Sequence, residues 1–282
     1  MKVAVTGAHG RVGQLVLAEL VKSGHEAVAL TRNRWAGCPV EQRLADVLDV
    51  EALVAGMQGC DAVIHLAAMA SPSAGAETAV FQSNAVGTFN VLLAAGQLGI
   101  RRASIASSGC ALGDTYNHKA LIPDYLPVDE RHPPRPDNCY GLGKLALEGV
   151  AEGFAQRFDM SIATLRITWV IGPTEYAKPW FLKSVANPDS GPRNLWGYID
   201  GQEAARAFRL GIETNLGGHE VFCISSSVNR CSVPAKLLIE KYYPGAELRG
   251  SFGAHESLID GSKAEALLGF KPEHRLDRVL GY

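Results

Sequence analysis

The sequence has little of what marks several large classes of protein. Its net charge is only −2, from 27 basic and 29 acidic residues, and its lysines and arginines form no cluster. A broad positive field for nucleic acid or for an anionic membrane surface is therefore not expected. No apolar run reaches the roughly 18 residues that cross a bilayer. We therefore expect a small-molecule partner, and neither nucleic acid nor membrane.

Cysteine is also scarce. The six cysteines are scattered, without the paired spacing of a zinc site, so no metal site is predicted. A chain of 282 residues with 47% hydrophobic residues can bury a large core and needs no disulfide framework. The opening MKVAVTGAHG leads directly into a strand-like run and lacks the features of a signal peptide. These observations predict a cytoplasmic protein.

Strand and helix patterns alternate along most of the chain. An apolar strand at 2–6, a periodic helix at 12–22 and a second strand at 26–31 form a βαβ unit. The alternation continues with strands near 61–66, 102–106 and 161–167 and helices at 84–97 and from Asn138 onward. The expected fold is α/β, a Rossmann-type doubly wound parallel sheet with a small interleaved C-terminal cap.

Two proline-rich stretches interrupt this pattern. Residues 121–136 contain five prolines, which exclude a helix or a central strand. Residues 174–195 look irregular and are expected to cover a substrate. We divide the chain into a dinucleotide-binding domain at 1–166, which carries the catalytic residues, and a region at 167–282 that is mainly substrate-binding cap, interleaved with the last Rossmann elements.

A glycine-rich loop joins the first strand to the first helix. Gly7, Gly10 and Gly13 are spaced G-x-x-G-x-x-G, which lets a pyrophosphate approach the backbone at the helix N-terminus. At the end of the second strand, Thr31 stands where an acidic residue would bind the ribose of NAD, and Arg32 follows. A guanidinium suits a 2′-phosphate, although Arg32 and Arg34 could equally lie on a solvated loop. NADP is favoured without excluding NAD.

Tyr140 and Lys144 lie one helical turn apart and face the same side. An adjacent ammonium and an oxidised nicotinamide favour the phenolate of a tyrosine, which suits general acid/base chemistry. A lone Y-x-x-x-K pattern also arises by chance or from plain packing.

These motifs together resemble the extended branch of the short-chain dehydrogenase/reductase superfamily, the NAD-dependent epimerase/dehydratase family. The loop TGAHGRVG looks like its TGxxGxxG motif, and YGLGK at 140–144 like its catalytic helix. The other matches are Asp46-Val47, HLAA at 65–68, Asn84 in NAVGTFN, LRITWVIGP at 165–173 and LIDGSKAEALLGFKP at 258–272. The segments around SSGCALG, RPDNCYGLGKLALEG and LWGYIDGQEAARAFRLGIE look most like a short, hexuronate-dehydrogenase-like group.

The resemblance implies an NAD(P)-dependent oxidoreductase that moves hydride between nicotinamide and a C–OH/C=O carbon. Tyr140 would exchange the substrate proton, Lys144 would bind the nicotinamide ribose, and Ser108 would bond the reacting oxygen, with Ser107 as alternative. Cofactor contacts are expected at Gly7, His9, Gly10, Arg11, Val12, Gly13, Thr31, Arg32, Asp46, Val47, Leu66, Ala67, Ala68, Asn84, Tyr140, Lys144 and Ile167. Substrate contacts are expected at Met69, Ser108, Gly109, Cys110, Tyr140, Trp169, Trp180 and Phe181.

Several readings stay open. Dehydratase relatives carry Thr-Asp-Glu where this chain has Ser108-Gly109-Cys110, which disfavours water elimination. Members of the branch that act on nucleotide-sugars carry an asparagine, in contact with the substrate, where this chain has Trp169. Its loss favours a small sugar acid or similar substrate. The alternatives are tailoring of an aromatic or polyketide secondary metabolite, sugar epimerisation, and a non-catalytic dinucleotide sensor, which would not need to keep Tyr140 and Lys144. Cys110 and Cys139 are interpreted as unreactive thiols rather than a redox pair.

The resemblance also implies a homodimer. Relatives of the extended branch commonly pair through the helices here expected at about 84–97 and 140–158, which form a four-helix bundle.

Overall fold

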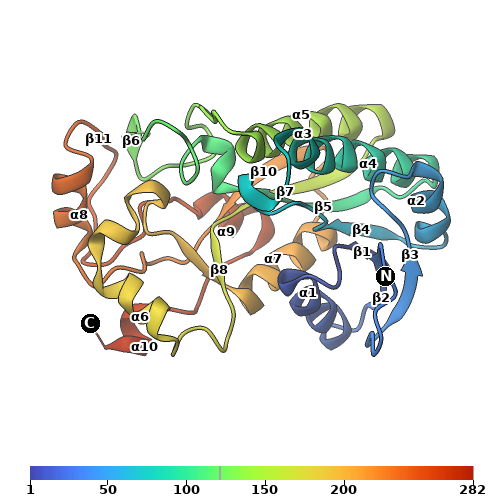
Figure 1. The fold of residues 1–282 in the computed structure, drawn as a ribbon, viewed down its shortest axis with the longest axis horizontal. Coiled ribbons are helices and arrows are strands. Elements are labelled where there is room, and N and C mark those ends of the chain that lie inside the picture. Colours follow the sequence, from blue (N-terminus) through green and yellow to red (C-terminus); the bar gives the residue numbers. More distant parts are fainter. Residues whose placement is uncertain (121, 282) are drawn as a thin grey trace.

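The computed structural model describes residues 1–120 and 122–281, and its centre is a sheet of seven parallel strands (Figure 1). The strand order is β10-β7-β5-β4-β1-β2-β3. The order runs outward from β1 in both directions, so β1 and β4 flank the switch point where such sheets bind dinucleotides. The strands are β1 (Lys2–Thr6), β2 (Glu26–Thr31), β3 (Glu41–Leu44), β4 (Ala62–His65), β5 (Arg102–Ser108), β7 (Ser161–Ile167) and β10 (His219–Ile224).

Helices cover both faces of this sheet, which confirms the doubly wound Rossmann-type prediction. On one face α1 (Arg11–Lys22), α7 (Gly201–Glu213) and α9 (Ser262–Leu268) bury one apolar cluster. On the other face α2 (Val50–Met57), α4 (Gly87–Gln97) and α5 (Cys139–Phe158) bury a second cluster. Figure 1 shows the two layers above and below the strands. Parallel strands buried on both sides explain the continuous apolar runs in the sequence.

Most predicted elements are present, and β2 and β7 have the predicted bounds. The predicted helix at 84–97 is longer, since α3 (Glu77–Phe81) and a π-helical turn, η2 (Gln82–Val86), precede α4. The helix α5, which carries Tyr140 and Lys144, follows Asn138, whose side chain caps it by accepting a hydrogen bond from the Gly141 amide at 2.9 Å. A capping asparagine there fixes the start of the helix.

The prediction that residues 174–195 are irregular is wrong. This segment contains α6 (Pro179–Ala186) and two single 3₁₀ turns, η4 (Pro188–Ser190) and η5 (Pro192–Asn194). Each of the three begins with a proline, at a position where the missing amide hydrogen bonds nothing in the helix. The three prolines of this segment therefore stand at the first positions of helical elements and do not indicate that helix is absent.

The other proline-rich stretch behaves as predicted where it is described. Leu121 lies outside the described residues, and 122–136 contain neither a helix nor a strand of the main sheet. Its one short strand, β6 (Tyr125–Leu126), pairs with β11 (Glu247–Leu248) in a separate two-stranded sheet. Two other 3₁₀ turns, η1 (Pro72–Ala74) and η3 (Gly109–Leu112), follow the ends of β4 and β5.

The cap lies beside the carboxyl ends of the strands, at the left of Figure 1. It contains α6, α8 (Ala235–Tyr242), α10 (Leu276–Leu280) and a small sheet of β8 (Trp169–Ile171) and β9 (Tyr198–Asp200), packed in two apolar clusters of its own. Between these segments the chain returns to the sheet as α7, β10 and α9. The division of the chain at residue 166 into a dinucleotide-binding domain and a cap region stays a prediction. Tyr282, the last residue of that cap region, lies outside the described residues. Within residues 1–120 and 122–281, no helix is long and apolar enough to span a membrane.

Candidate active site

The glycine loop after β1 has no space for larger residues. Gly7 has a φ of +66°, and a Cβ added there would lie 2.6 Å from the Ala67 nitrogen. A Cβ on Gly13 would lie 2.3 Å from the Gly7 carbonyl oxygen. The loop therefore packs directly against the segment after β4, and α1 begins at Arg11 with its first amides available to an anion. This cradle fits a dinucleotide pyrophosphate.

Tyr140 and Lys144 lie in the first two turns of α5, behind the end of β5. Both are buried, with 8% and 3% of their surfaces exposed. The Lys144 ammonium donates a hydrogen bond to the Ala106 carbonyl at 2.6 Å and lies 5.8 Å from the centre of the Tyr140 ring. The two side chains share one side of the helix, as their spacing predicts.

Burial dominates the electrostatics of this pair. It lowers the pKa of Lys144 to about 8, because a buried ammonium loses its hydration. It also raises the pKa of Tyr140, against a hydrogen bond with Ser108 that acts to lower it. The lowered tyrosine pKa expected from the sequence requires an oxidised nicotinamide and stays a prediction. In the protein chain burial raises this pKa, and the Lys144 ammonium lies at the Ala106 carbonyl.

The two candidate serines at the end of β5 have different surroundings. The Ser107 hydroxyl donates to a Glu148 carboxylate oxygen at 2.7 Å, and that carboxylate also pairs with Arg166 inside the protein. Ser108 lies beside Tyr140, and its oxygen accepts a hydrogen bond from the Cys110 amide at 3.2 Å. The geometry therefore brings Ser108, and not Ser107, next to the tyrosine.

A buried hydrogen-bond chain that the sequence reading did not identify connects β1 and β4 with the helix at α4. The Thr88 hydroxyl donates to the Asn84 carbonyl at 2.7 Å, so it can only accept from His65 Nε2, 3.0 Å away. His65 Nδ1 then accepts from the Thr6 hydroxyl at 2.7 Å. The imidazole is neutral, since burial lowers the pKa of His65 to about 3.

This chain ends on the backbone that was predicted to contact the cofactor. The Thr6 oxygen accepts hydrogen bonds from the Leu66 and Ala67 amides, both at 3.2 Å. The Asn84 side chain bonds both the amide and the carbonyl of Met69, at 2.9 and 3.1 Å. Asn84 therefore positions the segment after β4. A cofactor contact at Asn84 was expected from the resemblance and stays a prediction. Thr6 and Thr88 stand in the segments TGAHGRVG and NAVGTFN, but no role was assigned to either of them.

The end of β2 has no acidic side chain. The Thr31 hydroxyl donates to the Asn33 carbonyl at 2.8 Å and accepts from Gln42 at 2.5 Å, so its bonding capacity is used within the loop. Arg32 and Arg34 are exposed. His9 of the glycine loop stacks on Trp35, with ring centres 4.6 Å apart. Asp46 accepts a hydrogen bond from the Leu48 amide at 2.9 Å, and Val47 is buried against Gly87.

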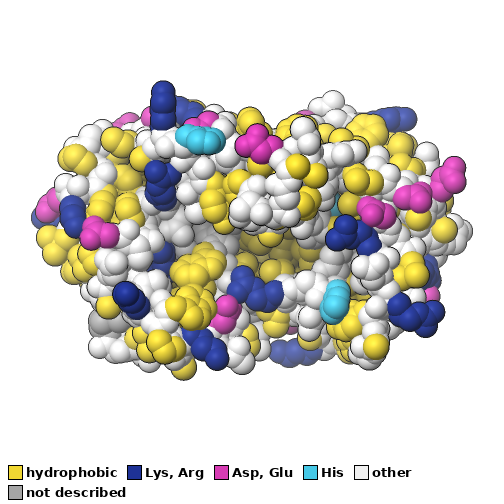
Figure 2. Space-filling model, in the orientation of Figure 1, with side chains coloured by type: hydrophobic (Ala, Val, Ile, Leu, Met, Phe, Trp, Pro, Cys, Tyr) yellow, Lys and Arg dark blue, Asp and Glu magenta, His cyan; other side chains and the backbone are white. Residues whose placement is uncertain are grey.

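One cavity of about 450 Å³ connects the glycine loop with Ser108, Tyr140 and the cap. Figure 2 shows the molecule hollowed near the middle of this face, with hydrophobic side chains in the hollow and charged ones around it. Of the predicted site residues, the structure brings to this cavity Arg11, Val12, Ser108, Gly109, Cys110, Tyr140, Ile167 and Trp169. The sequence reading missed Ala70, Asp114, Thr115, Tyr116, Thr168, Val170, Ser190, Asn194, Gly197 and Arg230.

Three residues predicted to contact substrate lie elsewhere. Phe181 is fully buried in the core of the cap, and Trp180 is 46% exposed on its surface beside Trp169. Met69 packs against the cluster of Cys110, Cys139 and Tyr140 behind the cavity wall. Since aromatic residues line pockets and fill cores equally well, the sequence pattern alone could not separate these positions.

The six cysteines are free, and five of them are buried. Burial raises the pKa of the cavity-lining Cys110 to about 12. A thiol with so high a pKa carries almost no thiolate at neutral pH, which agrees with its interpretation as unreactive.

Comparison with known proteins identifies the family. The model of the NAD dependent epimerase/dehydratase family matches residues 3–207, from β1 to α7. The chain belongs to this family. It is 34% identical to an L-arabinose 1-dehydrogenase (NAD(P)(+)) of Haloferax volcanii over 179 residues, which cover 62% of this chain and 69% of that protein. It is 27% identical to a UDP-glucose 4-epimerase of Corynebacterium glutamicum over 310 residues, covering 97% and 92% of the two chains.

Among solved structures, a glucuronic acid dehydrogenase from Chromohalobacter salexigens superposes with a TM-score of 0.71 at 23% identity, covering 99% of this chain and 87% of that one. That likeness shows the shared fold. Family and relatives together make this chain an NAD(P)-dependent oxidoreductase of the extended short-chain dehydrogenase/reductase type.

Proposed function

We propose that this enzyme transfers hydride between NAD(P) and a C–OH/C=O carbon of a small sugar or sugar acid that carries no nucleotide. The observation behind this proposal is the single cavity of about 450 Å³ that joins the glycine loop to Ser108 and Tyr140. Its volume lies within the range of roughly 300–1,000 Å³ typical of small-molecule sites. The related L-arabinose dehydrogenase acts on a substrate of this kind.

The proton steps follow from the positions of the side chains. A bound dinucleotide supplies or accepts the hydride at its nicotinamide. Tyr140, kept protonated by burial, donates its phenol proton to the carbonyl oxygen in reduction and becomes a phenolate. In the reverse oxidation the phenolate form of Tyr140 takes the proton of the substrate hydroxyl. Ser108, bonded to Tyr140, holds the same oxygen. One N–H of the Lys144 ammonium donates to the Ala106 carbonyl, and the other two can bind ribose hydroxyls.

An aromatic substrate is the second candidate. Tyr116 is 42% exposed and packs edge-on against Tyr140, with ring centres 5.9 Å apart, and Trp169 lines the same cavity. Two aromatic faces can hold an apolar ring, but they can also hold the C–H face of a sugar. The epimerase reading predicts conversion of a sugar nucleotide without net formation of reduced dinucleotide.

The test is an assay of reduced-dinucleotide formation with L-arabinose, D-glucuronate and UDP-glucose, each with NAD and NADP. We expect turnover of at least one of the two free sugars and none of UDP-glucose. Tyr140→Phe should lower turnover by about 100- to 10,000-fold, the range of lost acid/base catalysis, without weakening dinucleotide binding. Tyr242→Phe, a partly buried tyrosine of the cap that does not line the cavity, is the control. Absence of turnover with both free sugars would refute the substrate class, and full activity of Tyr140→Phe would refute its role.

We further propose that Arg32 favours NADP. It is exposed at the carboxyl end of β2, and no carboxylate follows Thr31 there to bind an unphosphorylated ribose. Fluorescence titration with NADH and NADPH should show tighter NADPH binding that is lost in Arg32→Ala. Arg101→Ala, another exposed arginine, should change neither affinity. Tighter binding of NADH by the wild type would contradict the proposal.

We also propose a homodimer that pairs through α4 and α5. Four large apolar side chains on or beside these helices are 40–44% exposed: Phe81, Val86, Phe89 and Leu142. Gly149 and Gly153 stand in the middle of α5 with open space where a Cβ would be. Mid-helix glycines cost about 1 kcal/mol each relative to alanine, and close approach of a second helix accounts for them. We place the enzyme in the cytoplasm, where thiols such as its six cysteines stay reduced.

A further inference from the structure

Asp114, which no sequence motif singled out, has a backbone position fixed by its neighbours. It follows Gly113, whose φ is +92° and where a Cβ would lie 2.4 Å from the Arg135 carbonyl oxygen. The Arg135 amide donates to the Leu112 carbonyl at 2.9 Å, and Asn117 donates to the Arg135 carbonyl at 2.8 Å. The turn is therefore fastened to the proline-rich segment on both sides of Asp114.

The two carboxylate oxygens of Asp114 have different surroundings. Oδ1 accepts hydrogen bonds from the amide and the hydroxyl of Thr115, the latter at 2.9 Å. Oδ2 lies 3.0 Å from the place that a Cβ on Gly109 would occupy. Because Gly109 directly follows Ser108, Oδ2 lies over the backbone next to the serine that bonds Tyr140. A side chain at position 109 would collide with this oxygen.

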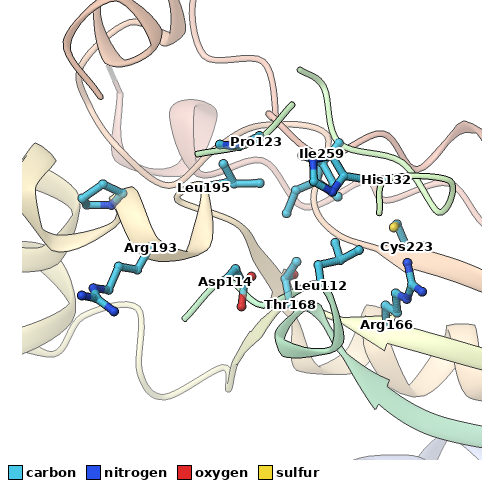
Figure 3. A pocket seen from close by; sticks show the side chains of 13 residues that line it. Leu112, Asp114, Pro123, His132, Arg166, Thr168, Arg193, Leu195, Cys223 and Ile259 are labelled. Carbon is cyan, nitrogen blue, oxygen red and sulfur yellow. The ribbon is translucent and has the colours of Figure 1, made fainter. Parts of the chain in front are cut away.

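Asp114 belongs to the substrate cavity. It lines that cavity together with Ser108 and Tyr140, and it also lines the smaller cavity shown in Figure 3. Figure 3 shows it beside Thr168, whereas the Arg193 side chain points away from it. Within the part of the chain that the structure describes, no ion pair joins Asp114 to a cation. The Thr115 amide and hydroxyl and the Cys110 thiol donate to this carboxylate. Without a cation beside it, the carboxylate gains from each further donor, because burying a charge is costly.

We propose that Asp114 Oδ2 accepts a hydrogen bond from a second substrate hydroxyl, on the carbon next to the one that exchanges hydride. Asp114 then selects substrates with two adjacent oxygens, one held by Ser108 and Tyr140 and one by Asp114. It also disfavours a substrate carboxylate at the second position, since like charges would meet in a buried site. This inference rests on the proposed sugar substrate.

The experiment compares a substrate with its derivative that lacks the neighbouring hydroxyl. L-Arabinose and 2-deoxy-L-ribose are such a pair for oxidation at C1. The wild type should lose about 10- to 100-fold in kcat/KM on the deoxy sugar, as expected when one buried hydrogen bond is lost. Asp114→Asn and Asp114→Ser should lose a similar factor on L-arabinose while no longer distinguishing the two sugars. Asp189→Asn, an exposed carboxylate of the cap, should keep the full discrimination.

The outcomes separate the two levels of inference. If the wild type oxidises L-arabinose but the Asp114 variants keep its preference over the deoxy sugar, Asp114 has no contact with the hydroxyl and this proposal is wrong. If the wild type oxidises neither L-arabinose nor D-glucuronate, the proposed sugar substrate fails and the role of Asp114 falls with it. Dinucleotide affinity, measured by fluorescence titration, should be the same in every variant. A loss of affinity in one Asp114 variant would reveal that this variant folds incorrectly. The other Asp114 variant then decides whether the proposal holds.

Discussion

At the scale of single residues, Lys144 shows how function opposes stability. Its ammonium is 3% exposed and has one backbone acceptor, so the folded state holds a cation in a poorly hydrated place. The pKa of Lys144 falls from 10.5 to about 8 for this reason. Between these two pKa values the unfolded chain binds more protons than the folded chain, so stability rises with pH there. The burial penalty is complete below pH 8 and is relieved as pH approaches 10.5.

Lys144→Met should therefore change the pH dependence of stability. Between pH 7 and pH 11 the wild type should gain about 3 kcal/mol in the free energy of unfolding relative to the variant. Only the wild type gains, because only it loses a buried proton over this range. Denaturant unfolding of both proteins at a series of pH values measures this difference. A difference that stays constant over the range would show that Lys144 has its ordinary pKa in the folded protein.

Tyr140 and Lys144 could be identified from their spacing, since one helical turn separates them wherever the helix lies. Asp114 and His65 could not be assigned in the same way. Asp114 reaches the cavity through a turn that closes on Arg135, 21 positions along the chain, and His65 is one member of a hydrogen-bond chain built from three elements. Such contacts depend on tertiary structure, and no local periodicity reports them.

At the scale of elements, the glycine loop and the long helix α5 use glycine for opposite reasons. Gly13 has backbone atoms within 3 Å of the place for a Cβ, whereas Gly149 has none within 4 Å. Gly13→Ala must therefore push α1 away from β1, and we expect dinucleotide affinity to fall by at least about tenfold with a loss of stability of roughly 1–3 kcal/mol.

Gly149→Ala is the matched control for that change. It should leave dinucleotide binding unchanged. In a single chain it should stabilise the helix by about 1 kcal/mol, whereas in the proposed dimer its methyl group stands against the approach of the second helix. Isothermal titration with NADH and thermal unfolding distinguish the two variants. Equal dinucleotide affinity of Gly13→Ala and the wild type would contradict the close packing of this loop.

The elements were predictable where a single periodicity covers the whole segment. Strand β2 has a continuous apolar run between Glu26 and Thr31, and β7 is rich in apolar residues although Thr164 and Arg166 interrupt them. The bounds of both strands were predicted correctly. The helix α6 was missed because Pro179 was taken as a breaker, although proline is favoured at a first helical position. The cap was harder to predict, since its small sheet pairs β8 with β9 from segments separated by α6 and two short turns.

At the scale of the whole molecule, the proposed pairing through α4 and α5 predicts a change of mass. A double variant, Phe89→Lys with Leu142→Glu, places charges on the exposed apolar face and should reduce the molar mass in solution to that of one chain. Leu237→Lys, at a leucine on α8 of the cap that is 53% exposed, should leave the mass unchanged. Light scattering after size exclusion measures both. A wild type with the mass of a single chain would refute the dimer.

The return of the chain from the cap to the sheet has a consequence for how the protein is made. The first six strands of the sheet are complete at Ile167, but the seventh, β10, begins only at His219. On a ribosome, β7 is therefore an open edge while the next 51 residues emerge, and its unpaired backbone groups can join any passing strand. The helix α7 emerges before β10 and lies against β7 and β5. A nascent chain stalled within residues 168–218 thus exposes a ready template for aggregation, and this interval is where a chaperone would be most useful.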